Sequence, residues 1–279
     1  MTHLLSKSKY IRGLQCDRAL WLDVHQPRLA RYTAEQMRRF DRGRDFEYAF
    51  KATFPHGIDI SAELKRNVDA YPERTAQLLD KGDGAVLFEA GFQYDDVLVL
   101  ADVVHQNTDG TLDIYEVKSG TALSETYRRD AALQHYVISH CRSVNKFYIV
   151  HAENKPEGLT DHRQGCEPLP QDKQSVEPRR GAPSGLPSGG DCNAGAHTPA
   201  CDGTSPSGTI ASEAPFVTID LTEALQSQHD EIEKNLAAMK DIIRGGEPAT
   251  PTGQHCLEPY ACPYQHYCAQ GVRQMSLFG

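Results

Sequence analysis

The sequence predicts an α/β fold whose core runs in the order helix, three-stranded meander, helix, strand. The first observation is a helical spacing of apolar residues in two long segments. The second is a series of short runs rich in β-branched and aromatic residues, separated by Asp, Asn and Gly turns. The expected elements are a helix at 33–54, strands at 85–94, 97–105 and 111–118, a helix at 125–140 and a strand at 146–151. We expect helical segments at both ends of the chain.

The second half continues the same domain after an insertion. A strand at 216–220 and an amphipathic helix at 221–243 are expected, with inward-facing residues Leu225, Ile232, Leu236, Met239 and Ile243. From about 156 to 215 the chain has nine Gly and nine Pro in 60 residues. Such a composition cannot bury enough apolar surface to offset chain entropy. We therefore predict one domain over residues 1–279, interrupted by a disordered insertion.

The composition argues against a transmembrane span, and the net charge argues against nucleic-acid binding. With 39% hydrophobic residues and a mean hydropathy of -0.54, the chain has no apolar run fit for a signal peptide or a membrane span. We expect a cytoplasmic protein. The net charge of -9 argues against phosphate contacts, which depend on Lys and Arg. Residues 1–60, however, hold eleven Lys and Arg against seven acids, so a basic patch with a local charge of +4 is compatible with the sequence.

Five polar residues stand in segments that the pattern assigns to the core. They are Glu47 on the stripe of the first helix, Asp102 in VLVLADVVH, Glu116 and Lys118 on one face of LDIYEVKSG, and Gln134 on the inner stripe of the second helix. Taken singly, each also fits an ion pair or a polar group on a helix face. Buried carboxylates without partners cost several kcal/mol, so converging ones require a cation or a proton. Their convergence indicates a divalent metal.

Hard oxygen ligands of this kind suit Mg²⁺ or Mn²⁺. The candidate ligands are Glu47, Asp102, Glu116 and the carbonyl of Val117. Lys118 would orient or deprotonate the attacking water and stabilise charge on the phosphate. Gln134 would position a lysine, a water or the substrate strand.

The order of these residues resembles that of the PD-(D/E)XK nuclease superfamily, and within it the RecB-like branch. Members have a restriction-endonuclease-like core with an acid or histidine in the first helix, a strand Asp, an acid-x-Lys in the next strand and, in the RecB-like branch, a Gln in the following helix. The matching positions, over roughly 33–151, are Glu47, Asp102, Glu116, Lys118 and Gln134. The resemblance implies a Mg²⁺- or Mn²⁺-dependent deoxyribonuclease in which all five residues are catalytic.

Four of the eight cysteines indicate a second site. Cys256, Cys262 and Cys268 are separated by two five-residue gaps, and Cys16 stands near the other end of the chain. In a chain without an export signal, free thiols or metal ligands are expected more than disulfides. Four thiolates could hold zinc or an iron–sulfur cluster.

This cysteine arrangement resembles the iron–sulfur staple of RecB-like nucleases of the AddB type and of CRISPR-associated exonucleases. Those families commonly have a CxxC in the triplet, whereas this chain has Cx5C. The segments LSKSKYIRGLQCDRALWL and HCLEPYACPYQHYC resemble more closely the N-terminal half of a largely uncharacterised bacterial family. The resemblance implies a 4Fe-4S cluster held by the four cysteines, closing the ends of the domain. It also implies a single-stranded DNA exonuclease whose partners are DNA and other DNA-processing proteins.

Two other functions remain open from the sequence. A non-catalytic nucleic-acid-binding or scaffold module with the same fold is favoured by the net charge of -9. It is weakened by the complete set of five polar residues, because a degenerate site would lose some of them. A structural zinc protein, in which the acid-x-Lys pair is incidental, also fits the cysteines.

Overall fold

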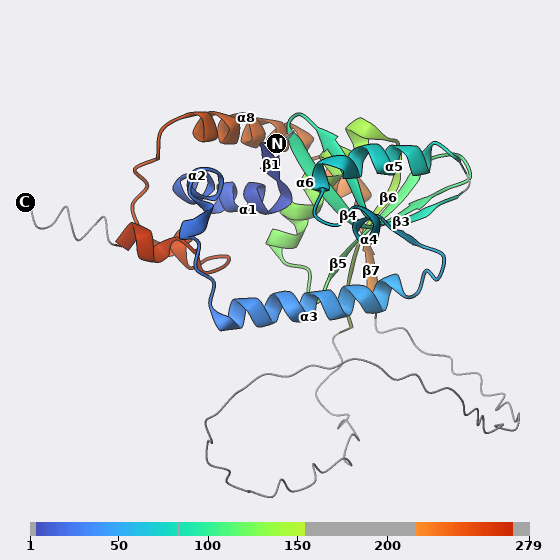
Figure 1. Cartoon of the computed structure of the whole chain (residues 1–279), viewed down its shortest axis with the longest axis horizontal. Helices are drawn as coiled ribbons and strands as arrows, with labels where there is room; N and C mark the ends of the chain where they lie inside the picture. Colours follow the sequence, from blue (N-terminus) through green and yellow to red (C-terminus); the bar gives the residue numbers. More distant parts are fainter. Residues whose placement is uncertain (1–3, 83, 154–215, 270–279) are drawn as a thin grey trace, which may run out of the picture. The chain divides into compact units, whose positions relative to one another are not determined.

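A computed structural model describes residues 4–82, 84–153 and 216–269 of the chain (Figure 1). The helices are α1 (Lys7–Gln15), α2 (Asp17–His25), α3 (Ala34–Lys51), α4 (Ile60–Leu64), α5 (Tyr71–Leu79), α6 (Glu125–Cys141), α7 (Thr222–Gln226) and α8 (His229–Arg244). The strands are β1 (Leu5–Ser6), β2 (Ile58–Asp59), β3 (Val86–Tyr94), β4 (Val97–Gln106), β5 (Leu112–Lys118), β6 (Val144–Ala152) and β7 (Phe216–Asp220). Short 3-10 turns lie at Pro27–Leu29, Val68–Ala70 and Gln254–Cys256. The insertion predicted at 156–215 lies outside the described residues.

The strands of the described residues form one mixed sheet in the order β2-β3-β4-β5-β6-β7, with β1 beside β4. β3, β4 and β5 are the antiparallel meander that the sequence predicts. β6 lies parallel to β5, and α6 supplies the crossover that a parallel pair needs. β7 pairs antiparallel with β6, so the chain beyond residue 215 adds to the same sheet. The predicted α/β class is confirmed.

Local sequence sets the ends of the elements that position the site. Thr33 and Gln36 form a reciprocal capping box at the start of α3, and Ser124 caps α6 by accepting a backbone hydrogen bond. Asp95 and Asp96 have φ values of 49° and 61°, as expected for a two-residue hairpin turn between β3 and β4. These signals are local, so the order of the core elements was predictable.

Helices cover both faces of the sheet. On one face, α5 and α6 share a large core with Leu87 and Ile114, which α1 and α8 join. On the other face, Phe50 of α3 packs with Phe88 and Val103. Side chains in the middle strands can therefore meet groups from α3 on one side and from α6 on the other.

The two ends of the described chain pack together. α8 lies beside α1 and α2 (Figure 1). The indole Nε1 of Trp21 in α2 donates to the carbonyl of Gly245, 3.0 Å away. The buried Tyr264 of the C-terminal segment donates its hydroxyl hydrogen bond to Asp23 of α2. The C-terminal segment is thereby fixed against α2.

The prediction of one continuous helix at 221–243 is wrong, because the structure has two helices, α7 and α8, separated by Ser227 and Gln228. The side chains of both residues donate to the carbonyl of Ala224 and so compete with the helical backbone. All five residues predicted to face inward are buried. Among the helices of the described residues, none is both long and apolar enough to cross a membrane.

Candidate metal centre

Asp102 lies where β4 and β5 separate. The ladder between these strands ends at Val103, which pairs with Tyr115. In place of the next backbone pair, the Asp102 carboxylate accepts a 2.7 Å hydrogen bond from the N–H of Val117. The Asp102 carboxylate thus takes the place of a backbone hydrogen-bond acceptor in the ladder. Asp102 is buried, at 8% exposed.

Glu89 of β3 lies opposite Asp102, and both strands are irregular at this point. The residues that flank Glu89 pair with those that flank Asp102, although the two acids do not themselves form a regular pair. Glu89 has a φ of 53°, which is uncommon for a residue other than glycine and marks a local distortion. Both carboxylates lie near Glu47 of α3.

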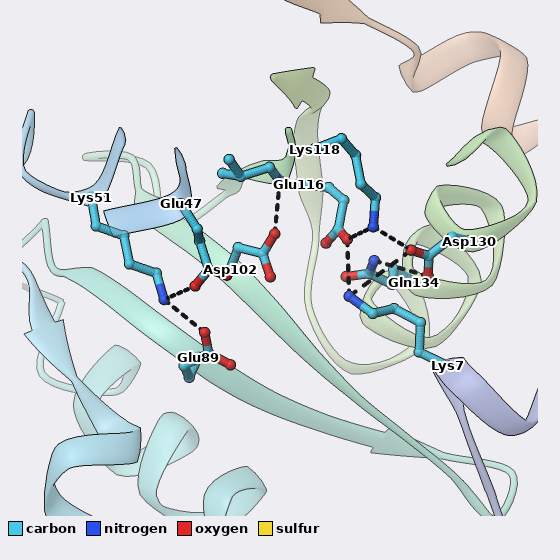
Figure 2. A network of polar contacts seen from close by, with 10 residues as sticks. Lys7, Glu47, Lys51, Glu89, Asp102, Glu116, Lys118, Asp130 and Gln134 are labelled. Atoms are coloured by element: carbon cyan, nitrogen blue, oxygen red, sulfur yellow. Dashed lines mark hydrogen bonds and ion pairs between the residues drawn. The ribbon is translucent and has the colours of Figure 1, made fainter. Parts of the chain in front are cut away.

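Glu47 of α3 completes an acidic cluster. One carboxylate oxygen each of Glu47, Glu89 and Asp102 lies within 4.8 Å of the others (Figure 2). Lys51, one turn further along α3, forms an ion pair with Glu47 and places its Nζ 2.6 Å from Glu89. Burial opposes the charge of Lys51, but Glu89 and Glu47 outweigh burial and raise its pKa. Lys51 therefore pairs with two of the three clustered acids.

Glu116 belongs to a neighbouring group of charges on the side of α6. Its Oε1 accepts from Nζ of Lys118, two residues along β5, and from Nζ of Lys7, 2.9 Å away. Lys118 also lies 2.6 Å from Oδ2 of Asp130 in α6, and Lys7 lies 4.0 Å from the same oxygen. Two ammonium groups and two carboxylates thus alternate around one point (Figure 2).

Two buried oxygens in this region have no hydrogen-bond partner within the described residues. They are Oε2 of Glu116 and Oε1 of Gln134, whose side chains are 1% and 0% exposed. The amide nitrogen of Gln134 donates weakly to Asp130, at 3.5 Å. A buried acceptor without a donor costs about 1–3 kcal/mol, so these oxygens indicate that a cation, a water or a substrate group belongs beside them.

The surroundings shift the two central acids in opposite directions. Burial, and with it the negative charge of Glu116, raises the pKa of Asp102 well above its usual range. Burial also disfavours the charge on Glu116, but Lys118 and Lys7 outweigh it and lower its pKa to about 2. Of these two neighbours, Asp102 is therefore the more readily protonated acid and Glu116 the more readily ionised one.

Lys118 is held as a cation. Burial opposes its charge, but Asp130 and Glu116 outweigh burial and raise its pKa. The ring of Tyr127 lies 5.5 Å from its Nζ and adds a cation–π contact. A lysine that keeps its proton at neutral pH is a poor general base. The arrangement therefore favours the predicted electrostatic role of Lys118 over removal of a proton from water.

The structure brings the five predicted polar residues into one region. Glu47 and Asp102 meet directly, and Glu116 and Lys118 share a face of β5 as the alternation predicts. Gln134 joins them through Asp130. Val117 contributes its N–H to Asp102, while a role for its carbonyl as a metal ligand stays a prediction.

Four charged residues of this region were not predicted. Glu89 interrupts the apolar run AVLFEAGFQY as Asp102 interrupts its own, so the same signal could have identified it. Asp130 lies one helical turn before Gln134, which places the two on one face. Lys51 and Lys7 carry no comparable signal, because lysines are common on helix surfaces.

The four predicted cysteines come together from both ends of the chain, and all have free thiols. Cys16 lies between α1 and α2, and the N–H of Cys262 donates to the carbonyl of Cys256 at 2.8 Å. Burial raises the pKa of the Cys16, Cys262 and Cys268 thiols, and the neighbouring Cys256 adds to the shift in each. The thiols are therefore close enough to interact.

The spacing of these sulfurs bears on the kind of metal they suit. Within the described residues, no three of them lie within 4.8 Å of one another. Tetrahedral zinc, with Zn–S bonds of about 2.3 Å, would hold them about 3.8 Å apart. In a 4Fe-4S cluster each sulfur binds a different iron, so the sulfurs lie further apart. A single zinc ion and a cluster would thus hold the four sulfurs at different distances, and metal analysis separates the two.

Comparisons with known proteins add little. No protein-family model and no curated protein sequence matches this chain. A solved structure described as "Crystal structure of SSO0001" is similar over 54% of this chain and 62% of its own, with 14% sequence identity and a TM-score of 0.26. The chain thus spans less than two thirds of the length of that structure. A likeness at this level carries no argument about fold or function.

Proposed function

We propose that this protein is a metal-dependent nuclease of the PD-(D/E)XK type, with a RecB-like core, that hydrolyses DNA and acts as an exonuclease on single strands. The observation that carries the proposal is the meeting of carboxylates from α3, β3 and β4 beside the Glu116–Lys118 pair of β5. Apart from β2, α4 and α5, which lie between α3 and β3, the elements from α3 to β6 follow the order helix, three strands, helix, strand. This order supports the same proposal, because it is the one expected for that nuclease core.

The acids suit a hard divalent cation. The candidate ligands for Mg²⁺ or Mn²⁺ are Glu47, Glu89, Asp102 and the unpartnered Oε2 of Glu116. Such a cation would activate water and neutralise charge on the phosphodiester. Lys118, held as a cation, would stabilise the negative charge that develops on the phosphate. Gln134 would accept a hydrogen bond from water or from the substrate.

We propose further that Cys16, Cys256, Cys262 and Cys268 hold a 4Fe-4S cluster, with zinc as the alternative. The packing of Cys16 with Cys262 and Cys268, and the partial burial of the thiols, support a shared metal group. Its role would be structural, since Tyr264, between Cys262 and Cys268, fixes this segment to α2.

A non-catalytic nucleic-acid-binding module is the second candidate. This binding module is favoured because lysines of the chain already pair with most of the acids of the candidate metal centre. Lys51 pairs with Glu47 and Glu89, and Lys118 pairs with Glu116. A chain balanced in this way folds without requiring a metal, so metal-dependent cleavage is the property that separates the two candidates.

Cleavage of labelled single-stranded and duplex DNA in Mn²⁺ tests the proposal. Asp102→Asn should reduce the rate more than about 100-fold, because even indirect partners of a catalytic metal cost about 10–100-fold. Lys118→Met should reduce it about 10²–10³-fold, as removal of other groups that stabilise developing charge does.

Two matched controls address nonspecific effects of these substitutions. Asp113→Asn alters another β5 carboxylate, which accepts from two asparagines. Lys146→Met alters an exposed lysine that pairs with Asp220. Both should cut DNA as wild type does. Undiminished cleavage by Asp102→Asn and Lys118→Met would refute the catalytic proposal, and wild-type protein that binds DNA without cutting it would support the binding module.

A further inference from the structure

Lys7 reaches the metal centre from the N-terminal end of the described chain. Leu5 and Ser6 form β1, which pairs with β4 at Val97 and Leu98, beyond the point where β5 leaves β4. α1 begins at the next residue, Lys7. Backbone pairing therefore fixes the first turn of α1 beside β5, and the position of Lys7 follows from it.

Lys7 and Lys118 contact the same oxygen of Glu116 (Figure 2). The side chain of Lys7 is 27% exposed, and that of Glu116 is 1% exposed. Glu116 Oε1 thus has two lysine donors, whereas Oε2 has none in the part of the chain that the structure describes. The two oxygens of this carboxylate are distinct: one is occupied by cations of the chain, and the other is available to an added ligand.

We propose that Lys7 is a positioning residue that holds Oε1 of Glu116, so that Oε2 faces the divalent cation and Lys118 is released to the phosphate. The inference rests on the proposed nuclease function. Without Lys7, Lys118 would have to neutralise both Glu116 and Asp130, which it contacts together. With Lys7 in place, Glu116 keeps a counter-charge when Lys118 turns toward the substrate.

α1 connects this contact to the cysteine site. The helix has nine residues and spans about 13 Å, with Lys7 at its start and Gln15 at its end. The amide nitrogen of Gln15 lies 2.7, 3.1 and 2.7 Å from the carbonyl oxygens of His255, Glu258 and Tyr260. Cys16 follows directly. One short helix thus joins the segment that carries Cys256, Cys262 and Cys268 to Glu116. A change that displaces one end of α1 should therefore also displace the other end.

Calorimetric titration of Mn²⁺ into the full-length protein tests the role of Lys7 without relying on activity. Lys7→Met should weaken Mn²⁺ affinity about 10-fold or more, the cost typical of a residue that orients a metal ligand. Lys7→Arg keeps the cation and should restore most of the affinity. Lys7→Gln keeps a hydrogen-bond donor but removes the positive charge. It takes the place of Lys7→Met in the comparison with wild type if the methionine variant does not fold.

Lys9→Met is the matched control. Lys9 lies on the same helix, but its ammonium donates to the carbonyl of Leu4, 3.1 Å away. It should bind Mn²⁺ as wild type does. An affinity of Lys7→Met equal to or higher than that of wild type would overturn the role of Lys7 and leave the nuclease proposal intact. Failure of wild type to bind Mn²⁺ would overturn both.

Discussion

A carboxylate in the middle of an apolar strand is stable only with a partner, and the two central acids have different ones. Asp102 accepts from the N–H of Val117 and holds a proton readily, whereas Glu116 is ionised between two lysines. Because Asp102 is readily protonated, the two acids can lie side by side without two full negative charges. A divalent cation could displace a proton from Asp102 and bind the carboxylates of both residues.

Glu89 is expected to contribute to metal binding. Glu89→Gln preserves the size of the side chain but removes one of three clustered carboxylates, so Mn²⁺ affinity should fall about 10-fold in a calorimetric titration. Glu63→Gln alters an exposed glutamate paired with Arg74 and should have no effect. An unchanged affinity in Glu89→Gln would mean that Glu89 serves only as an ion-pair partner of Lys51.

A second prediction concerns the buried His135, whose Nδ1 lies 2.8 Å from Nε2 of His229. Burial, with a contribution from His229, lowers the pKa of His135 to about 4. The unfolded chain, with a pKa of about 6.5, binds a proton that the folded protein does not, so stability is lost as the pH falls from 6.5 toward 4. Urea unfolding should show on the order of 1–2 kcal/mol less stability at pH 5 than at pH 7.5 from this group.

His135→Gln removes the titrating group and should flatten that pH dependence. The slope is the relevant quantity, since the substitution changes stability at every pH. The same slope in the variant and in wild type would assign the acid sensitivity to other groups.

Sequence patterns identified acids in apolar segments but not the cations that accompany them. Glu47, Asp102 and Glu116 were predictable because a charge in an apolar stripe is unusual. Lys7 was not, because it contacts Glu116 from 109 residues away and only the fold brings them together.

At the scale of elements, the separation of β4 and β5 is the feature that positions the site. The meander itself was predictable from alternation and turn residues. The irregular pairing of β3 and β4 at Glu89 and Asp102 was not predictable, since alternation assumes a regular ladder and this distortion arises where several strands and α3 meet. The break between α7 and α8 escaped prediction for a similar reason, because the apolar stripe continues across it.

α1 is the element that joins the two candidate sites, and Gln15 anchors one end of it. Gln15→Leu has a similar size but removes the two amide N–H donors that three carbonyl groups share, so the protein should lose about 1–3 kcal/mol of stability. Thermal unfolding together with iron content measures the effect. Gln77→Leu, on the exposed face of α5, is the control. A Gln15→Leu protein as stable and as iron-rich as Gln77→Leu would show that this anchor is dispensable.

At the scale of the whole molecule, the two ends of the described chain pack together through α2, α8 and the segment that carries Cys256, Cys262 and Cys268. The prediction of a contact between Cys16 and the C-terminal triplet rested on resemblance, and the structure brings the thiols close enough to interact. The prediction of a single domain with an insertion stays a prediction, since the insertion at 156–215 lies outside the described residues.

Anaerobically purified protein should be brown, with about four irons per chain. Cys16→Ser should lose the iron, unfold at a lower temperature and bind Mn²⁺ more weakly, because α1 then loses its anchored end. Cys141→Ser alters an exposed cysteine outside the set and should behave as wild type. Colourless protein with stoichiometric zinc would exclude the cluster.

The central claim is that the acids of α3, β3, β4 and β5 hold a divalent cation. Anomalous diffraction from crystals grown with Mn²⁺ tests it most directly. The account predicts an anomalous peak within bonding distance of Asp102 and of Oε2 of Glu116, with at least one of Glu47 and Glu89 turned from Lys51 toward the metal. Crystals without a peak there, in which Lys51 still pairs with both glutamates, would contradict it.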